Sequence, residues 1–213
     1  MSIKDVKLKK PKVNKATDYL LEDSYNEDYF VNCIFNNNID DNIVIESTIF
    51  DGCIFNNIDF SNIELIDVEL LDCVFNNCDL SNKSFNDKFI ERVEFNDCKL
   101  IGISFINSRL KDVLIDNCNC KYVNFANTNF NTVIINNSDL SQISFYETIL
   151  KNILFDNVNF DKAEVYNTLL NKIDFSTCTI TDMLIDQKSL NGMIIDRFQS
   201  QDLVRMLGVE FKD

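Results

Sequence analysis

A period of five residues runs through most of this chain and constrains its fold more than any other feature. Every residue whose number is a multiple of five, from Ile45 to Ile195, is apolar, and thirteen of the chain's 18 phenylalanines fall in this column. Residues two positions earlier are mostly Cys, Ile, Val, Thr and Ser. A period of five fits neither an α-helix, at 3.6 residues per turn, nor a flat strand, at 2. It predicts a coil in which each five-residue side turns two side chains inward and three outward.

The spacing of the cysteines predicts how many such sides complete one turn of the coil. Two series of cysteines recur at intervals of 20 residues: Cys33, Cys53 and Cys73, then Cys78, Cys98 and Cys118, with Cys178 later in the second column. Four sides of five residues stack these thiols directly above one another, as expected in a solenoid whose coils pack only on their neighbours. Residues 31–195 then make about eight coils, in a rod roughly 40 Å long at about 4.8 Å per coil.

Over roughly residues 31–195 the chain resembles the pentapeptide-repeat family. Segments that match its pattern of a small residue, any residue, and Leu or Phe are Cys33–Phe35, Cys78–Leu80, Val123–Phe125, Ser138–Leu140 and Val158–Phe160. The resemblance implies an all-β fold, a right-handed quadrilateral β-helix with the multiples of five pointing inward. This chain uses Cys, Ile and Val where the family usually has alanine. We expect that difference to widen the coil or loosen its corners without changing its topology.

One stretch, residues 81–90, departs from the residue types that the repeat requires. Lys83 and Lys88 occupy consecutive small inward positions, where a lysine must extend its ammonium group outward or the coil must bulge. Looping these ten residues out would break the column formed by Cys78, Cys98 and Cys118. We therefore expect residues 81–90 to stay in the coil.

The two ends of the chain are not repeats, and we predict three parts: residues 1–30, 31–198 and 199–213. Residues 1–15 carry six lysines and one acid, and residues 16–30 carry five acids and no base. We interpret the first stretch as a basic arm and the second as an N-terminal cap, with a helix as one form of that cap. The arm has three alternatives: a solvated tail, a segment folded onto the acidic rod, or a contact with nucleic acid.

The C-terminal sequence predicts a short helix from Ser200 that Gly208 ends. A cap on the rod requires one apolar face, and this segment carries an additional apolar tail. We therefore predict a homodimer whose interface contains Leu203, Met206, Leu207, Val209 and Phe211. The segment also resembles the C-terminal module of Qnr-type quinolone-resistance proteins, in which it joins two rods end to end.

Charge is distributed unevenly around the predicted rod. The chain has a net charge of −14 and no histidine, and residues 31–195 hold 24 acids and 11 bases. The first acidic face, centred on positions 45, 65, 85 and onward, carries Glu46, Glu64, Asp67, Asp87, Glu147, Glu164 and Asp186. The second acidic face, opposite it and centred on 55, 75, 95 and onward, carries Glu94, Asp97, Asp116, Asp156 and Asp174. The third face, centred on 40, 60 and 80, has a net charge of −4, and the fourth face, centred on 50, 70 and 90, has +2.

Several classes of function do not fit this sequence. Outward carboxylates on a convex rod form no catalytic cleft, and no histidine is present to act as a base. The cysteines lie at inward positions and lack the CxxC spacing of a zinc site. The excess of acidic over basic residues disfavours direct binding to nucleic acid, whose phosphates repel a negatively charged surface. We expect no enzymatic activity, cofactor, metal or small-molecule substrate. No signal-peptide core or membrane span is evident, so we expect a cytoplasmic protein with reduced thiols and no membrane association.

The Qnr-type resemblance implies a protein partner, DNA gyrase or topoisomerase IV. The rod would mimic duplex DNA, bind the enzyme through its acidic faces and modulate it. The repeat has no frame-breaking insertion, a feature similar to loop-free gyrase inhibitors, so the choice between inhibition and quinolone protection stays open. The alternative is a structural or scaffolding repeat protein that binds an unrelated partner.

Overall fold

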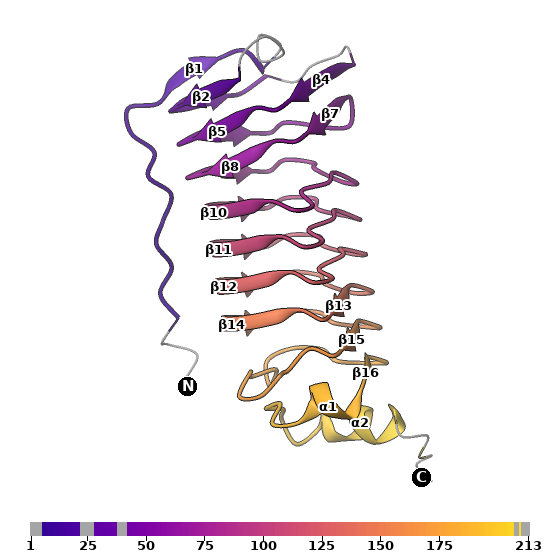
Figure 1. The fold of residues 1–213 in the computed structure, drawn as a ribbon. Helices are drawn as coiled ribbons and strands as arrows, with labels where there is room; N and C mark the ends of the chain where they lie inside the picture. The colour runs from indigo at the N-terminus through magenta and orange to yellow at the C-terminus, as the bar shows by residue number, and fades with distance from the viewer. Residues whose placement is uncertain (1–5, 22–27, 38–41, 207–208, 210–213) are drawn as a thin grey trace.

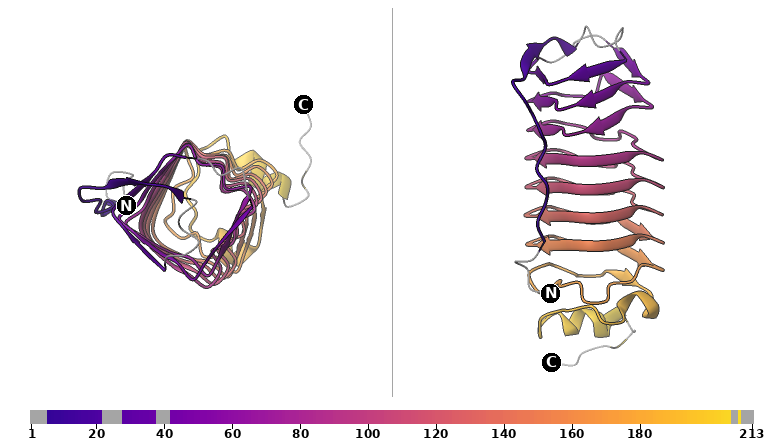
Figure 2. Two further views of the ribbon diagram at one scale, coloured as in Figure 1. Left: turned by 90° about the horizontal axis from the view of Figure 1, so that it is seen from above. Right: turned by 60° about the vertical axis from the view of Figure 1, so that its left-hand side comes forward.

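The computed structural model shows a four-sided rod of stacked coils, about eight turns long and built almost entirely from strands (Figure 1). Seen along its axis, the rod has the outline of a square (Figure 2). The structure describes residues 6–21, 28–37, 42–206 and 209. The predicted β-helix is confirmed.

Within the described residues, the largest sheet has eleven strands, all paired in parallel. Its main path joins β1 (Thr17–Tyr19), β3 (Cys33–Phe35), β6 (Ile54–Asn56), β9 (Val74–Asn76), β10 (Phe89–Asn96), β11 (Arg109–Asp116), β12 (Asn129–Asn136) and β14 (Ile149–Asp156). A branch of the same sheet joins β2 (Tyr29–Val31), β5 (Ile49–Asp51) and β8 (Glu69–Leu71) to β10. The long strands from β10 onward therefore turn a corner and belong to two sides of the rod.

Two smaller sheets form on another side, and two helices follow near the C-terminus. The sheets contain β4 (Ile43–Glu46) with β7 (Ile63–Ile66), and β13 (Ser144–Tyr146) with β15 (Glu164–Tyr166) and β16 (Leu184–Ile185). The helices are α1 (Gln187–Leu190) and α2 (Ser200–Met206). The strand pairs have the predicted offset of 20 residues, as where Val113 pairs with both Val93 and Val133.

The multiples of five form the core, as the sequence predicts. Most are buried, and half-buried ones such as Leu65 and Leu150 still pack against the core. The phenylalanines stack along the axis: the ring of Phe75 lies 4.6 Å from that of Phe55 and 5.1 Å from that of Phe95, with interplanar angles of 5° and 15°. Parallel, offset rings at these distances add to the energy of apolar burial.

The second inward column explains why Cys, Ser and Thr recur every 20 residues. Their side chains donate hydrogen bonds to carbonyl oxygens 23 residues earlier: Cys73 Sγ to Phe50 at 3.2 Å, Ser108 Oγ to Phe85 at 2.6 Å, and Thr128 Oγ1 to Phe105 at 2.6 Å. All eight cysteines are buried free thiols. Burial raises the pKa of Cys53 to about 12, so the thiol stays protonated and able to donate. Sequence analysis identified these positions only as small and inward.

Asparagine and aspartate form most corners of the coil, at positions two residues after each multiple of five. Asn57, Asn77 and Asn117 have φ angles of 57°, 52° and 53°. These residue types tolerate the left-handed region better than other non-glycine residues, which explains how a chain with four glycines turns so many corners. Glycine is required at corners Gly52 and Gly102, because a Cβ atom there would lie 2.6 Å from the Oδ1 atoms of Asn32 and Asn82, respectively.

Residues 81–90 stay in the coil, as predicted. Ser84 pairs with Ser104, and Ile90 pairs with both Leu70 and Leu110. The ammonium group of Lys88 extends outward to form an ion pair with Asp67. Its backbone N–H donates to Ser108 Oγ at 3.0 Å, so the lysine fits without a bulge.

The two ends of the rod are covered differently from each other. At the N-terminal end, two short strands continue the sheet: β1 pairs with β3, and β2 pairs with β5. Backbone pairing with the following coils satisfies the hydrogen bonds of these strands. Residues 22–27 lie outside the described residues, and the helix considered for this cap stays a prediction there. At the C-terminal end, the buried Gln199 donates to the carbonyls of Phe175 and Cys178 at 2.8 and 2.6 Å. Leu203 packs against the core.

We expect Phe75→Ala to lower the free energy of unfolding by about 3–5 kcal/mol, because it leaves a cavity between two stacked rings. The measurement is urea denaturation followed by circular dichroism. Phe89→Ala is the matched control, since Phe89 is 48% exposed and its loss should cost less than about 1 kcal/mol. Equal losses for the two variants would contradict the assignment of the core column.

Candidate protein-binding faces

The first acidic face presents more exposed carboxylates than any other described face of the rod. Strands β4, β7, β13, β15 and β16 run along it. Exposed on it are Glu46, Glu64, Asp67, Asp87, Glu147 and Glu164. Tyr146 and Tyr166 lie beside the last two, paired across β13 and β15, and are 45% and 37% exposed. Carboxylates and aromatic rings thus lie together on its C-terminal half.

Three carboxylates of this face already have partners within the protein. Asp67 pairs with Lys88, and Asp87 Oδ1 accepts a hydrogen bond from the Asn107 amide at 3.1 Å. Asp186 caps α1: its carboxylate accepts hydrogen bonds from the backbone N–H of Ser189 at 2.9 Å and of Asn167 at 2.6 Å. Burial raises the pKa of Asp186, but these hydrogen bonds and one from the Ser189 hydroxyl outweigh it and lower the pKa overall. The remaining carboxylates of the face carry the accessible charge.

The second acidic face is built differently. Asp97 is exposed, whereas Glu94, Asp116, Asp156 and Asp174 are half-buried. Beside them runs a ladder of amides in which Asn56, Asn76 and Asn96 each donate to the asparagine 20 residues earlier, at 2.8, 2.8 and 3.1 Å. Asn117 and Asn137 donate to Asp97 and Asp116. Sequence analysis missed this ladder, although asparagines at intervals of 20 residues gave a signal for it.

The third and fourth faces neutralise much of their charge internally. On the third face, Lys99 pairs with Asp79 and Lys121 with Asp139, both at 3.3 Å. On the fourth, Lys111 pairs with Glu91 at 2.9 Å, and Arg92 binds Asp72. Among ion pairs between described residues, only that of Lys88 with Asp67 uses a carboxylate of the two acidic faces. Uncompensated negative charge is therefore concentrated on those two faces.

The described part of the basic arm, residues 6–15, lies along the outside of the rod, crossing the long strands β10, β11, β12 and β14 (Figure 2). Two backbone contacts fix it there: Lys12 N–H donates to Asp72 Oδ1 at 2.8 Å, and Lys9 N–H donates to Asp112 Oδ1 at 3.1 Å. Of the three alternatives for residues 6–15, the structure shows the folded one.

The predicted dimer residues are only partly described. Leu203 is half-buried against the rod's own core, Val209 is 48% exposed, and Met206 ends α2. Leu207 and Phe211 lie outside the described residues. Phe198, just before α2, is 81% exposed and was not among the predicted residues. In the described part of the chain, neither helix has the length and apolar character needed to cross a bilayer.

Comparison with known families identifies the repeat. A family model described as "Pentapeptide repeat region" matches residues 43–125 and 68–143. A second, described as "Pentapeptide repeats (8 copies)", matches residues 138–176. Together the two models cover well over half of the chain. Among curated proteins, no sequence is a significant match.

Solved structures similar to this chain are repeat proteins at low sequence identity. A trypsin-treated form of QnrB1, a plasmid-mediated fluoroquinolone resistance protein, is 17% identical, with a TM-score of 0.35, 92% of this chain covered and 100% of that chain. A pentapeptide-repeat protein of the Arabidopsis thaliana thylakoid lumen is 14% identical, with a TM-score of 0.35 and coverages of 62% and 84%. HetL, involved in heterocyst differentiation regulation in the cyanobacterium Nostoc, is 12% identical, with a TM-score of 0.29 and coverages of 87% and 92%.

We expect Asp186→Ala to destabilise the protein by about 1 kcal/mol at neutral pH, because it removes the cap of α1. Asp186→Asn should cost less, since asparagine also caps helices. The lowered pKa means that the charge of Asp186 stabilises the fold above about pH 3.9, the ordinary value for an aspartate, and that this stabilisation is lost as the pH falls through the folded-state pKa. Urea denaturation at pH 7 and pH 3 measures the difference between wild type and Asp186→Asn. A difference that does not change with pH would contradict the charged cap.

Proposed function

This chain belongs to the pentapeptide-repeat family, and from that premise we propose that it is a non-catalytic rod that imitates duplex DNA. Its acidic faces would occupy the DNA-binding groove of a type II topoisomerase, DNA gyrase or topoisomerase IV, and so modulate the enzyme. The observation that carries the proposal is the concentration of carboxylates without ion-pair partners on two opposite faces.

The spacing of charge along the rod supports DNA mimicry. Twelve carboxylates lie on the two acidic faces. Spread over a rod roughly 40 Å long, they give about one charge per 3 Å when both faces are counted, roughly half the charge density of duplex DNA, which has about one charge per 1.7 Å with both strands counted. A groove that evolved to bind phosphates therefore meets negative charge on two opposite sides of the rod, as it does on duplex DNA. Attraction of this kind speeds association and weakens as salt screens it.

The C-terminal resemblance to Qnr-type proteins supports the choice of a topoisomerase and of an end-to-end homodimer. Leu203 is already used to cover the last coil. We therefore place the dimer contact on the apolar groups beyond it, Val209 together with Leu207 and Phe211, and add Phe198, the most exposed large apolar side chain of the described residues. Joining two rods would double the length of the acidic faces.

We expect micromolar protein to inhibit DNA supercoiling by purified gyrase, or to change the enzyme's inhibition by ciprofloxacin. Glu147→Gln combined with Glu164→Gln should raise the concentration needed for half the effect by roughly fivefold, at about 0.5 kcal/mol per charge. The matched control is Asp161→Asn with Asp182→Asn, which removes the same charge from the third face and should change little. The effect should also weaken between 50 and 200 mM salt, conditions chosen to vary screening.

The outcomes separate the proposed partner from the proposed face. If the wild-type protein has no effect on supercoiling or on drug inhibition, the topoisomerase is not the partner, and the scaffolding alternative is favoured. If the two pairs of substitutions weaken the effect equally, total charge and not the first acidic face is responsible.

We expect the wild-type protein to have twice its chain mass of 24.7 kDa in light scattering, and Phe198→Glu with Val209→Glu to have the mass of a monomer. A charge buried without a partner in an apolar contact strongly disfavours association. Ile149→Glu is the control, because Ile149 is 58% exposed on a side of the rod and its change should leave the dimer intact. A double variant that stays dimeric would contradict this interface.

A further inference from the structure

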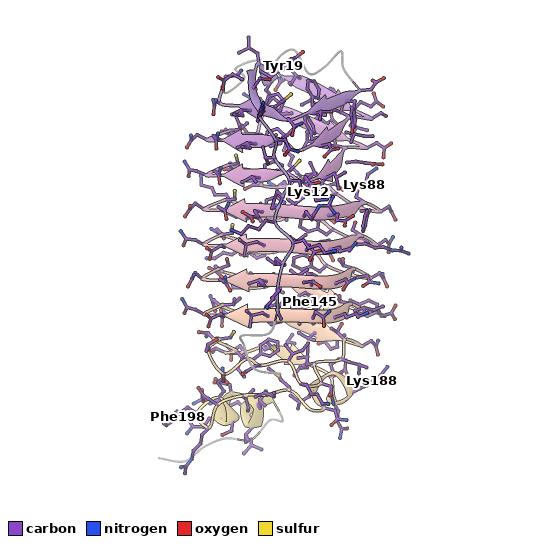
Figure 3. The ribbon with its side chains drawn as sticks, turned by 90° about the vertical axis from the view of Figure 1, so that its left-hand side faces the viewer. Lys12, Tyr19, Lys88, Phe145, Lys188 and Phe198 are labelled. Atoms are coloured by element: carbon purple, nitrogen blue, oxygen red, sulfur yellow. The ribbon has the colours of Figure 1, made fainter. Side chains whose placement is uncertain are left out.

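The basic arm is held by its backbone along one corner of the rod (Figure 3). The N–H groups of Lys9 and Lys12 donate to carboxylates of Asp112 and Asp72, and that of Asn14 donates to Asn32 Oδ1 at 2.9 Å. All three acceptors belong to one column of corner residues at multiples of 20 residues from position 32. The rod thus offers a straight line of acceptors parallel to its axis.

The spacing of two of these acceptors, Asp72 and Asp112, matches an extended chain. Asp72 and Asp112 lie two coils apart, which is about 9.6 Å, and three residues of extended chain span about 10 Å. Lys9 and Lys12, which donate to them, are three residues apart. An extended chain along this corner therefore presents an N–H group to each of these two carboxylates.

The side chains of the arm divide into two sets. Val6, Leu8, Pro11, Val13 and Ala16 are half-buried, whereas the lysines are exposed: Lys7, Lys9, Lys10, Lys12 and Lys15. The rod therefore contacts the backbone and the apolar side chains, and the ammonium groups project into solvent. Contact of this kind recognises an extended segment with apolar residues at intervals and does not require one particular lysine.

The rod's side of the contact is held in place by its own residues. Arg92 binds both carboxylate oxygens of Asp72, with Nε at 2.6 Å and the second amino group at 2.8 Å. Asp72 and Asp112 are only 4% and 5% exposed. Burial raises the pKa of Asp72, but the hydrogen bonds from Arg92 and from the Lys12 backbone, with the charges of both residues, outweigh it and lower the pKa overall. The acceptor is thus charged and oriented at neutral pH.

We propose that this corner, defined by Asp72, Arg92 and Asp112 and called here the peptide strip, is a binding site for an extended, lysine-rich peptide segment. The chain's own arm is its intramolecular occupant, and such a segment of a partner protein displaces it. The net charge of −13 on residues 31–195 favours a cationic ligand over an acidic one. Because the arm is tethered, it competes at an effective concentration in the millimolar range. The site is independent of the topoisomerase proposal.

The test removes the arm from the peptide strip by changing only residues of the arm. Lys9→Pro with Lys12→Pro removes both N–H donors from the arm, because proline has none. Lys9→Gln with Lys12→Gln is the matched control, since it removes the same two charges and keeps both donors. Each full-length protein is titrated against a fluorescently labelled peptide of residues 6–16, and binding is followed by anisotropy. We expect the proline variant to bind the peptide at least about tenfold more tightly than wild type or the glutamine variant.

Further variants make the result specific to the strip. A labelled peptide with proline at positions 9 and 12 should bind at least about tenfold more weakly to the proline variant. Adding Asp112→Asn to that variant should also weaken binding of the native peptide. The proposal is overturned if the proline variant, shown to be folded by circular dichroism, does not bind the peptide. Equal binding by all three proteins would also overturn it, because it would reflect general charge attraction.

Discussion

The hydrogen bonds between successive coils are the constraint on which the rest of the structure depends. Each coil donates to and accepts from residues about 20 positions away: Phe85 N–H donates to the carbonyl of Ser104 at 2.8 Å, and Ser104 N–H donates to that of Lys83 at 3.0 Å. Because the backbone bonds run along the axis, every side chain must stack on one 20 residues away. The inward column at the multiples of five is then apolar in every coil, the second inward column holds mostly small side chains, and an outward column repeats its chemistry or alternates it.

That stacking places side chains of the same charge above one another, and the four faces differ in how this repulsion is reduced. Like charges about 4.8 Å apart repel one another. On the third face, lysine alternates with aspartate, as in Lys99 above Asp79. The second acidic face interleaves asparagine, whose amides donate to neighbouring oxygens, as Asn117 does to Asp97. The first acidic face leaves exposed carboxylates such as Glu147 and Glu164 without either device. Uncompensated charge of this kind lowers the stability of the fold. That cost is a physical reason to assign the first acidic face a role in binding.

Much of this architecture was predictable because it follows from a local rule repeated many times. The inward columns, the 20-residue register and the place of Lys88 in the coil need only the period of five. Contacts between unrelated segments were not predictable in that way. Nothing in the spacing of Lys9 and Lys12 indicates that their backbone N–H groups bind Asp112 and Asp72, because any residue except proline has that donor. The capping role of Asp186 depends on α1, a helix within the repeat that the apolar period conceals.

The position of the arm also makes the two acidic faces differ in negative potential. Its corner separates the fourth face from the second acidic face, so the exposed lysines of the arm border the carboxylates of the latter. Those carboxylates are mostly half-buried beside the asparagine ladder. Over separations within a Debye length of about 8–10 Å, the lysines reduce the negative potential there. A positively charged groove would repel this edge of the rod and attract the first acidic face, where Glu147 and Glu164 are exposed beside Tyr146 and Tyr166. Toward the proposed cationic partner, the arm would therefore favour contact through the first acidic face, and displacing the arm would make the second acidic face more negative.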